Sequence, residues 1–401
     1  MGFAHSRWII TLKRLIFHIC LPVIWVVGSG CSTIGPNKLV SSHEGYNDAV
    51  QLTITREVLK NIVRSRYSDP MQFITVASIN AQFSVSAGAN VGASGIGTQS
   101  EAGQVGGNIG YSDSPTITYI PQSDAGFNKS IDSPVDLQEA VSYVFHWGQF
   151  QPHEVGLVIG AVNDAHDRSG PAGDSYRARV DALVRLIERG ATLRHFREFY
   201  PRHAPIPMSK IDGRAYVDAA EAGFYFYDAG DGKLLLASKH LGIGMVVPFP
   251  HKDETEADLR ILGLTPGKRL YPIRAPAEAE PEPFGIQPNT IWLAPRSTEG
   301  MIELAAMSVE VPPEHKRIGV APAAGPAVNS GVVLPMRIFH STQQPTSVYR
   351  IQHRGYWFYI DDTDTASKQL FSTIVQAYTS RIGSRTPTDK APQIVLPIGG
   401  G

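Results

Sequence analysis

A strict alternation of apolar and small polar residues over positions 83–94 is the feature that most constrains how this chain folds. Phe83, Val85 and Val91 stand at odd positions with alanines between them, whereas Ser, Gly and Asn fill the even positions. Because successive side chains of a β-strand point to opposite faces, this period of two predicts a strand with one apolar face.

A second alternating run follows a segment rich in Gly, Ser and Gln over residues 95–104. It includes Val105, Ile109 and Tyr111, and residues 115–121 continue it as a second strand. Two such runs joined by a polar segment predict a long antiparallel hairpin over residues 83–120. The candidate interaction residues of this hairpin are Phe83, Val85, Val91, Val105, Ile109, Tyr111 and Tyr119.

Three roles fit this predicted hairpin. Its arms of about ten residues are long enough to cross an outer membrane, so several copies could close a barrel together. A single copy could not, since its strand edges would stay unpaired in lipid. A mobile surface hairpin and a stalk that packs against a partner's hairpin are the soluble alternatives, which the small apolar area of Ala and Gly favours.

The first 30 residues have the composition of an export signal. Arg7, Lys13 and Arg14 precede an apolar stretch over residues 15–27 that is short for a bilayer-spanning helix. The segment that follows, Gly28 to Cys31, resembles the lipobox of bacterial lipoproteins, in which the cysteine becomes the acylated first residue. The resemblance implies a signal peptide over residues 1–30, a lipid on Cys31 and a tether over residues 31–45.

The lipobox departs from the usual pattern at one position, which leaves a second interpretation open. Leu or Val usually stands three residues before the cysteine, whereas this chain has Gly28 there and Val27 one step earlier. Gly28 and Gly30 also suit ordinary signal peptidase, which would release the protein freely. In the lipidated form, Ser32 after the cysteine is compatible with the outer membrane, so we expect an outer-membrane lipoprotein facing the periplasm.

Patterns beyond the tether predict an α+β fold with an N-terminal helix, the long Gly/Ser-rich hairpin, a helical middle and a mainly β C-terminal part. The helix and hairpin fill residues 46–130, and the helical section fills 131–200, where Ser133 and Pro134 are expected to begin a helix. The rest divides into a small β-rich section, a Pro-rich linker and an α/β section, over residues 201–271, 272–290 and 291–401.

Charge and cysteine content exclude several classes of function. The chain has 36 basic and 37 acidic residues and no long basic run, which argues against nucleic-acid binding. Its two cysteines, Cys20 and Cys31, lie near the N-terminus, so the body has no disulfide, thiolate metal site or Cys nucleophile. Acylation is the one evident use for Cys31.

No motif predicts a metal, a cofactor or a catalytic residue. His153-Glu154 lacks the second histidine of the zinc-protease pattern, and Gly92 to Gly95 is not a nucleophile elbow. The acidic group Asp361, Asp362 and Asp364 lacks the calcium-loop pattern, and Asp362 or Thr363 as a helix N-cap explains it.

The aromatic run Tyr356 to Tyr359 predicts a strand with Tyr356 and Phe358 on one face and Trp357 and Tyr359 on the other. Burial on both faces is the simpler interpretation. The alternative is an aromatic platform for a glycan or a partner protein, with Tyr356 and Trp357 as its candidate interaction residues.

Several short segments of the sequence occur together in a known group of proteins. They include the segments 61–67, 76–83, 115–121, 355–362 and 395–397. On these motifs the chain resembles uncharacterised lipoproteins of Gram-negative bacteria over nearly its whole mature length. The resemblance implies an envelope location and assigns no activity.

The sequence therefore predicts an envelope protein that meets the membrane through its N-terminal lipid and associates with itself or with envelope partners. Its expected role is non-catalytic: structural, scaffolding or transport assembly, with oligomers formed through the 83–120 hairpin. The alternative is an enzyme that acts on an envelope polymer, with a site assembled only in the fold.

Overall fold

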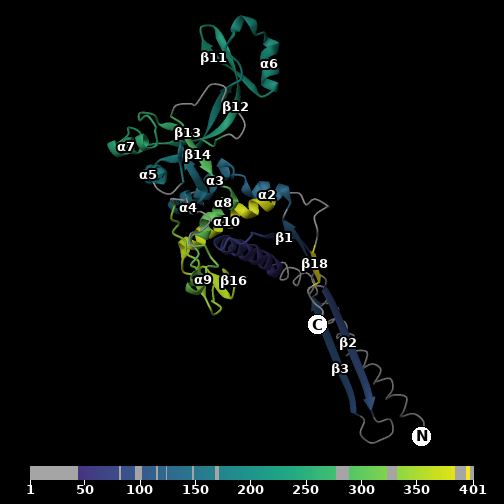
Figure 1. The fold of residues 1–401 in the computed structure, drawn as a ribbon. Coiled ribbons are helices and arrows are strands. Elements are labelled where there is room, and N and C mark those ends of the chain that lie inside the picture. Colours follow the sequence, from purple (N-terminus) through teal and green to yellow (C-terminus); the bar gives the residue numbers. More distant parts are fainter. Residues whose placement is uncertain are drawn as a thin grey trace, which may run out of the picture. The chain divides into compact units, whose positions relative to one another are not determined.

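The computed structural model describes residues 44–80, 83–94, 102–113, 116–122, 124–146, 149–167, 171–276, 289–322, 332–383 and 394–397. The chain divides into two compact units, Met1–Arg56 and Glu57–Gly401. Helices and sheets are both numerous in the second unit, which confirms the predicted α+β class (Figure 1). The predicted signal peptide and Cys31 lie outside the described residues.

The predicted N-terminal helix is present over residues 44–66. Val58, Leu59, Ile62 and Val63 on its C-terminal half are fully buried, which explains their helical spacing. The helix ends where Ser68 adopts a positive φ of 58°. Among the described residues, no helix combines the length and apolar character needed to cross a membrane.

An eight-stranded sheet forms the centre of the second unit, with strand order β10-β12-β13-β14-β7-β8 and with β9 and β11 also paired to β12. All of its pairs are antiparallel except β13–β14. The strands are β7 (Ile159–Val162), β8 (Ala165–His166), β9 (Thr192–Pro201), β10 (Ile206–Pro207), β11 (Phe224–Gly230), β12 (Lys233–Val246), β13 (Leu270–Arg274) and β14 (Ile291–Pro295).

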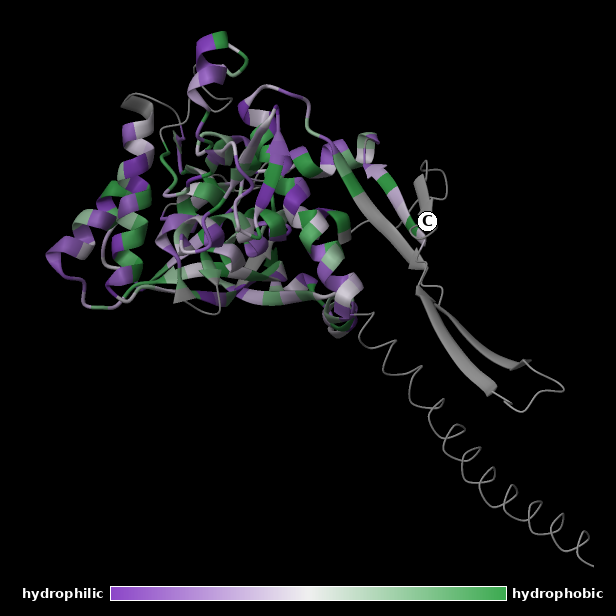
Figure 2. Cartoon of the chain, turned by 90° about the horizontal axis from the view of Figure 1, so that it is seen from below, coloured by the Kyte–Doolittle hydropathy of each residue, from purple (hydrophilic) through white to green (hydrophobic). Residues whose placement is uncertain are grey.

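Residues 277–288 of the predicted Pro-rich linker lie outside the described residues, and the strands before and after them, β13 and β14, are neighbours in this sheet. The helices of this unit are α2 (Ala125–Asp132), α3 (Leu137–Val144), α4 (Pro152–Val158), α5 (Pro171–Glu188), α6 (Gly213–Glu221), α7 (Asp253–Ile261), α8 (Thr298–Ala306), α9 (Pro313–Ile318) and α10 (Thr365–Gly383), of which α3, α4, α5 and α6 contact the eight-stranded sheet. Figure 2 shows hydrophobic and hydrophilic residues interleaved along these helices, as expected where one face packs on a core.

The predicted start of the helix at Ser133 is wrong. Ser133 instead follows the end of α2, and Pro134 is extended and bridges to Ser297. The N-cap of α3 is Asp136, whose carboxylate accepts a hydrogen bond from the Gln138 amide at 2.8 Å. Ser133 and Asp136 are both short polar residues that precede an apolar run, so either could cap a helix. The backbone bridge of Pro134 to Ser297 keeps the chain extended there, and the helix therefore begins after Asp136.

The C-terminal part contains a three-stranded sheet of order β15-β17-β16, formed by Phe339–Ser341, Tyr356–Tyr359 and Arg350–His353. The turn between β16 and β17 has positive φ at Arg354 and Gly355, a conformation that glycine adopts readily. The last strand, β18 (Ile394–Pro397), pairs antiparallel with β4 (Thr116–Gln122).

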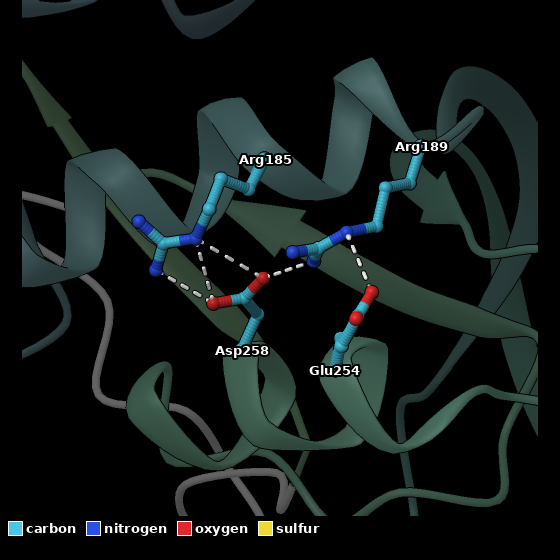
Figure 3. Close-up of polar contacts among 4 residues, drawn as sticks. All are labelled: Arg185, Arg189, Glu254 and Asp258. Atoms are coloured by element: carbon cyan, nitrogen blue, oxygen red, sulfur yellow. Dashed lines mark hydrogen bonds and ion pairs between the residues drawn. The ribbon is translucent and has the colours of Figure 1, made fainter.

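An ion-pair cluster fixes α7 against α5 (Figure 3). Asp258 of α7 accepts hydrogen bonds from Arg185 and Arg189 of α5, and its side chain is only 5% exposed. Burial alone would raise the pKa of Asp258, but the two arginines outweigh it and hold the pKa below its usual range. Glu254 lies 3.9 Å from Arg189 at the exposed edge of the same cluster.

Candidate functional site

The predicted hairpin is present and extends further than its alternating pattern. β2 (Phe83–Ser94) and β3 (Ala102–Asp113) pair antiparallel in twelve successive residue pairs. At their base, β1 (Phe73–Asn80) pairs with β4, so each arm continues through a second strand. A register shift between Val76 and Ser78 interrupts the β1–β4 ladder.

The register of β2 and β3 brings the predicted interaction positions together. Val85 pairs with Tyr111 and Val91 pairs with Val105, while Ile109 pairs with Ala87. Odd-numbered positions therefore oppose odd-numbered positions along the whole ladder, and they share one face of it. The apolar positions of β2 therefore lie opposite the apolar positions of β3.

One of the predicted positions falls outside this ladder. Phe83 belongs to it, as the first residue of β2, opposite Asp113. Tyr119 lies in β4, where it pairs with Val76 and Ile394 in the separate sheet of order β1-β4-β18. Tyr119 therefore belongs to the base and not to the β2–β3 ladder.

Within the described residues, β2 and β3 pair only with each other. Each strand therefore keeps one edge with unpaired backbone N–H and C=O groups. Such edges pair readily with further strands, and a two-stranded hairpin by itself is marginally stable in water. This geometry makes the hairpin the candidate functional site, and pairing or packing with another hairpin is the chemistry that it offers.

A second cluster joins the end of the N-terminal helix to the C-terminal sheet. The Tyr67 hydroxyl lies 2.7 Å from Nδ1 of His315 in α9, and both residues are buried. Nε2 of His353 lies 3.0 Å from a carboxylate oxygen of Asp69, and Arg354 donates to the same carboxylate at 2.7 Å. The spacing of these residues in the sequence gives no signal that they meet.

Burial sets the protonation of this cluster. It lowers the pKa of His353 to about 4 and raises that of Tyr67 to about 12. Burial alone would raise the pKa of Asp69, but Arg354 and His353 outweigh it and lower the pKa. At neutral pH His353 is therefore uncharged beside an ionised Asp69.

An aspartate beside a histidine is an arrangement that acid–base catalysis uses. Here Tyr67 is 4% exposed and His315 is 6% exposed, so two of the ring side chains are out of reach of a substrate. The hydrogen bonds of the cluster run between its own members. It can therefore hold the end of the N-terminal helix to the sheet, while the side chains of His353 and Asp69 stay 10% and 25% exposed.

The predicted aromatic strand places its two candidate residues on different faces. Tyr356 contacts the ring of His315 at a centroid distance of 4.9 Å, and Phe358 on the same face is fully buried. Trp357 and Tyr359 on the opposite face are half-buried, and so is Tyr356. Neither face of the strand is therefore completely buried, and the two candidates, Tyr356 and Trp357, are both half-buried on opposite faces.

The acidic group at residues 361–364 caps a helix, but through a residue other than those predicted. Asp364 accepts a hydrogen bond from the Ser367 amide at 3.0 Å and caps α10, while Asp361 accepts from the Thr363 amide at 2.8 Å. Across the described residues, no group of three or more His, Cys, Asp or Glu side chains could hold a metal ion.

Two glutamates have raised pKa values that the sequence did not predict. Glu57 accepts hydrogen bonds from the Ile74 amide and the Tyr378 hydroxyl, at 2.5 and 3.1 Å. Glu154 of α4 is 2% exposed. Burial raises the pKa of both carboxyl groups to about 7, and single carboxyl-bearing residues give no sequence signal of such burial.

No protein-family model, curated protein or solved structure matches this chain. Its function therefore has to be inferred from the chemistry of its own residues.

Proposed function

We propose that this protein is an exported lipoprotein of the cell envelope with a non-catalytic assembly role, and that it self-associates through the β2–β3 hairpin. The observation that carries the proposal is the twelve-pair ladder, in which the apolar positions of both strands are in register. The lipobox-like segment ending at Cys31 supports the location, and the outer membrane is the proposed site of anchoring.

The physical support is the small stability of such a ladder in isolation. The large apolar residues at the odd-numbered positions of the ladder are three valines, Ile109, Phe83 and Tyr111. Ala or Gly stands at nearly all of the other odd-numbered positions. Small side chains bury little apolar area, and each Gly weakens a strand. Pairing with the same face or edge of a second copy would supply the contacts that one hairpin lacks.

The full-length protein, purified in detergent from native membranes, tests this proposal. Asp substitutions at Val85 and Val91 place two charges on the apolar register, and we expect them to reduce the oligomer to monomers. The matched control places the same charges at Ser84 and Asn90, on the other register of the same strand, and should keep the oligomer. Light scattering coupled to size-exclusion chromatography gives the mass of each species.

Two outcomes would overturn the proposal. A monomeric wild-type protein would remove the self-association, and equal masses for the two double variants would remove the role of the apolar register. Deletion of residues 85–109 should also abolish the oligomer. Mass spectrometry of the N-terminal peptide tests the location separately, because a lipidated chain carries its acyl groups on Cys31.

The alternative of an envelope-polymer hydrolase finds less support. Its best candidate is the pair of Asp69 and His353, where a neutral imidazole lies beside a carboxylate. The buried Tyr67 and His315 next to this pair serve contacts inside the protein. A His353→Gln variant that loses stability but no hydrolytic activity on peptidoglycan would agree with a structural role.

A further inference from the structure

An apolar cavity lies between the eight-stranded sheet and helices α3, α4 and α5. Its volume is about 40 Å³, and all of its lining side chains are apolar, among them Val155, Leu183, Met245 and Leu293. Such a wall offers no hydrogen bond, so burial of a polar group there would be costly. The cavity suits a hydrocarbon group.

A larger and more open cavity of about 500 Å³ adjoins the first. Val141, Phe145 and Leu193 line both, so these three side chains stand where the two cavities meet. Phe145 is held by an aromatic contact with Phe150 at a centroid distance of 5.3 Å. The two cavities therefore lie side by side, a small one with an apolar lining and a larger one that also has polar lining residues.

The larger cavity has polar as well as apolar lining residues, and Arg194 gives it a positive charge. Its lining includes the guanidinium of Arg194, the imidazole of His195 and the polar side chains of Gln138 and Thr192, and within the described chain no acidic residue lines either cavity. The two acids of this end of α3 are engaged elsewhere: Asp136 caps the helix, and Glu139 accepts a hydrogen bond from Tyr143.

We propose that the paired cavities bind a free fatty-acid-like amphiphile, with the methyl end in the small cavity and the carboxylate beside Arg194. The volume of the small cavity, about 40 Å³, exceeds the roughly 10–15 Å³ that one water needs, so it admits a few carbon atoms in a row. It is well below the roughly 150 Å³ of a cavity that holds benzene, which disfavours an aromatic ring. The excess of positive charge selects an anionic head group.

The proposal predicts how affinity depends on the ligand. Each additional methylene group of the ligand that is buried against the apolar lining should raise the affinity about fourfold. The gain should stop once the chain is longer than the two cavities together. A carboxylate should bind more tightly than an alcohol of the same length, because only the carboxylate pairs with Arg194.

The test uses the full-length protein transferred from detergent into an amphipathic polymer, so that no free detergent competes. Sodium octanoate, decanoate and dodecanoate, with dodecanol as the uncharged probe, are titrated by calorimetry. The ¹⁹F resonance of 12,12,12-trifluorododecanoate reports whether the chain end becomes buried. Binding here does not depend on self-association of the hairpin, so the two proposals succeed or fail separately.

Two pairs of variants locate the site. Val141→Trp should fill the junction of the cavities and weaken dodecanoate binding at least tenfold, whereas Val217→Trp makes the same change at an exposed position of α6 that lines neither cavity. Arg194→Gln should weaken dodecanoate about tenfold and leave dodecanol unchanged. Arg197→Gln, three residues further along β9 and outside the lining, is its control.

Circular dichroism confirms that each variant is folded. Absence of saturable binding to the wild-type protein would overturn the proposal, as would equal affinities of the Val141→Trp and Val217→Trp variants. An affinity that does not rise from octanoate to dodecanoate would exclude burial of the chain against the apolar lining. Equal binding of dodecanol and dodecanoate would exclude Arg194 as the head-group contact.

Discussion

Glu154→Gln is expected to stabilise the protein at alkaline pH, because it removes an acid from the core. Glu154 lies in α4 with 2% exposure, and its hydrogen-bond partner is the side chain of Thr373. In the described part of the chain, its second carboxylate oxygen has no hydrogen-bond partner. Gln keeps the shape of the side chain and carries no charge at any pH.

The magnitude follows from the pKa. Burial raises the pKa of Glu154 from 4.5 to about 7, so the folded state holds the proton more tightly than the unfolded chain does. The group therefore contributes stability below pH 4.5, and that contribution is lost as the pH rises towards 7. Each pKa unit corresponds to about 1.4 kcal/mol, so the full loss is about 3 kcal/mol.

Urea unfolding of the wild-type and Glu154→Gln proteins at pH 5 and pH 8 measures this effect. The variant should gain about 2–3 kcal/mol relative to wild type between the two pH values. Subtracting the wild-type curve removes the contributions of the other titrating groups. Glu188→Gln, an exposed change at the end of α5, should show no such gain, and a gain for Glu154→Gln that is independent of pH would refute the reasoning.

Three further predictions concern the other buried polar groups. Asp258→Asn should lower the free energy of unfolding in urea at pH 7 by about 2 kcal/mol, since it weakens the contacts with two arginines. Glu254→Gln in the same cluster should change it by less than about 0.5 kcal/mol. Equal effects would contradict the argument that the burial of Asp258 strengthens its ion pairs. Tyr67→Phe should cost about 1–2 kcal/mol in the same assay, because it leaves a buried imidazole nitrogen unpaired, and an unchanged midpoint would count against that hydrogen bond. In an NMR titration His353 should gain its proton near a pKa of about 4, so stability falls as the pH drops from 6.5 towards that value, and protonation near 6.5 would contradict the burial of the ring.

Local patterns predicted the elements whose side-chain periodicity is strong. The N-terminal helix and the β2–β3 hairpin follow from the spacing of their apolar residues alone. The register of the hairpin was not predicted, although it agrees with the alternation, since a slip of one residue would place apolar positions opposite polar ones.

The remaining features depend on contacts between distant segments. α6 and α7 lie in the section predicted to be β-rich, and their short amphipathic patterns resemble those of loops. Tyr67 meets His315 across 248 positions of the sequence, a pairing that no local pattern encodes. The paired cavities likewise combine residues from α3, α5 and several strands.

Self-association through the hairpin is the central claim, and site-specific photocrosslinking in native membranes tests it most directly. A photoreactive side chain placed at Ala89 lies on the apolar register of β2, and the same group at Gly88 lies on the other register. The account predicts products at twice the mass of the chain, or higher multiples, from Ala89 and far fewer from Gly88. Crosslinks from Ala89 only to other proteins, or no crosslink from either position, would contradict it.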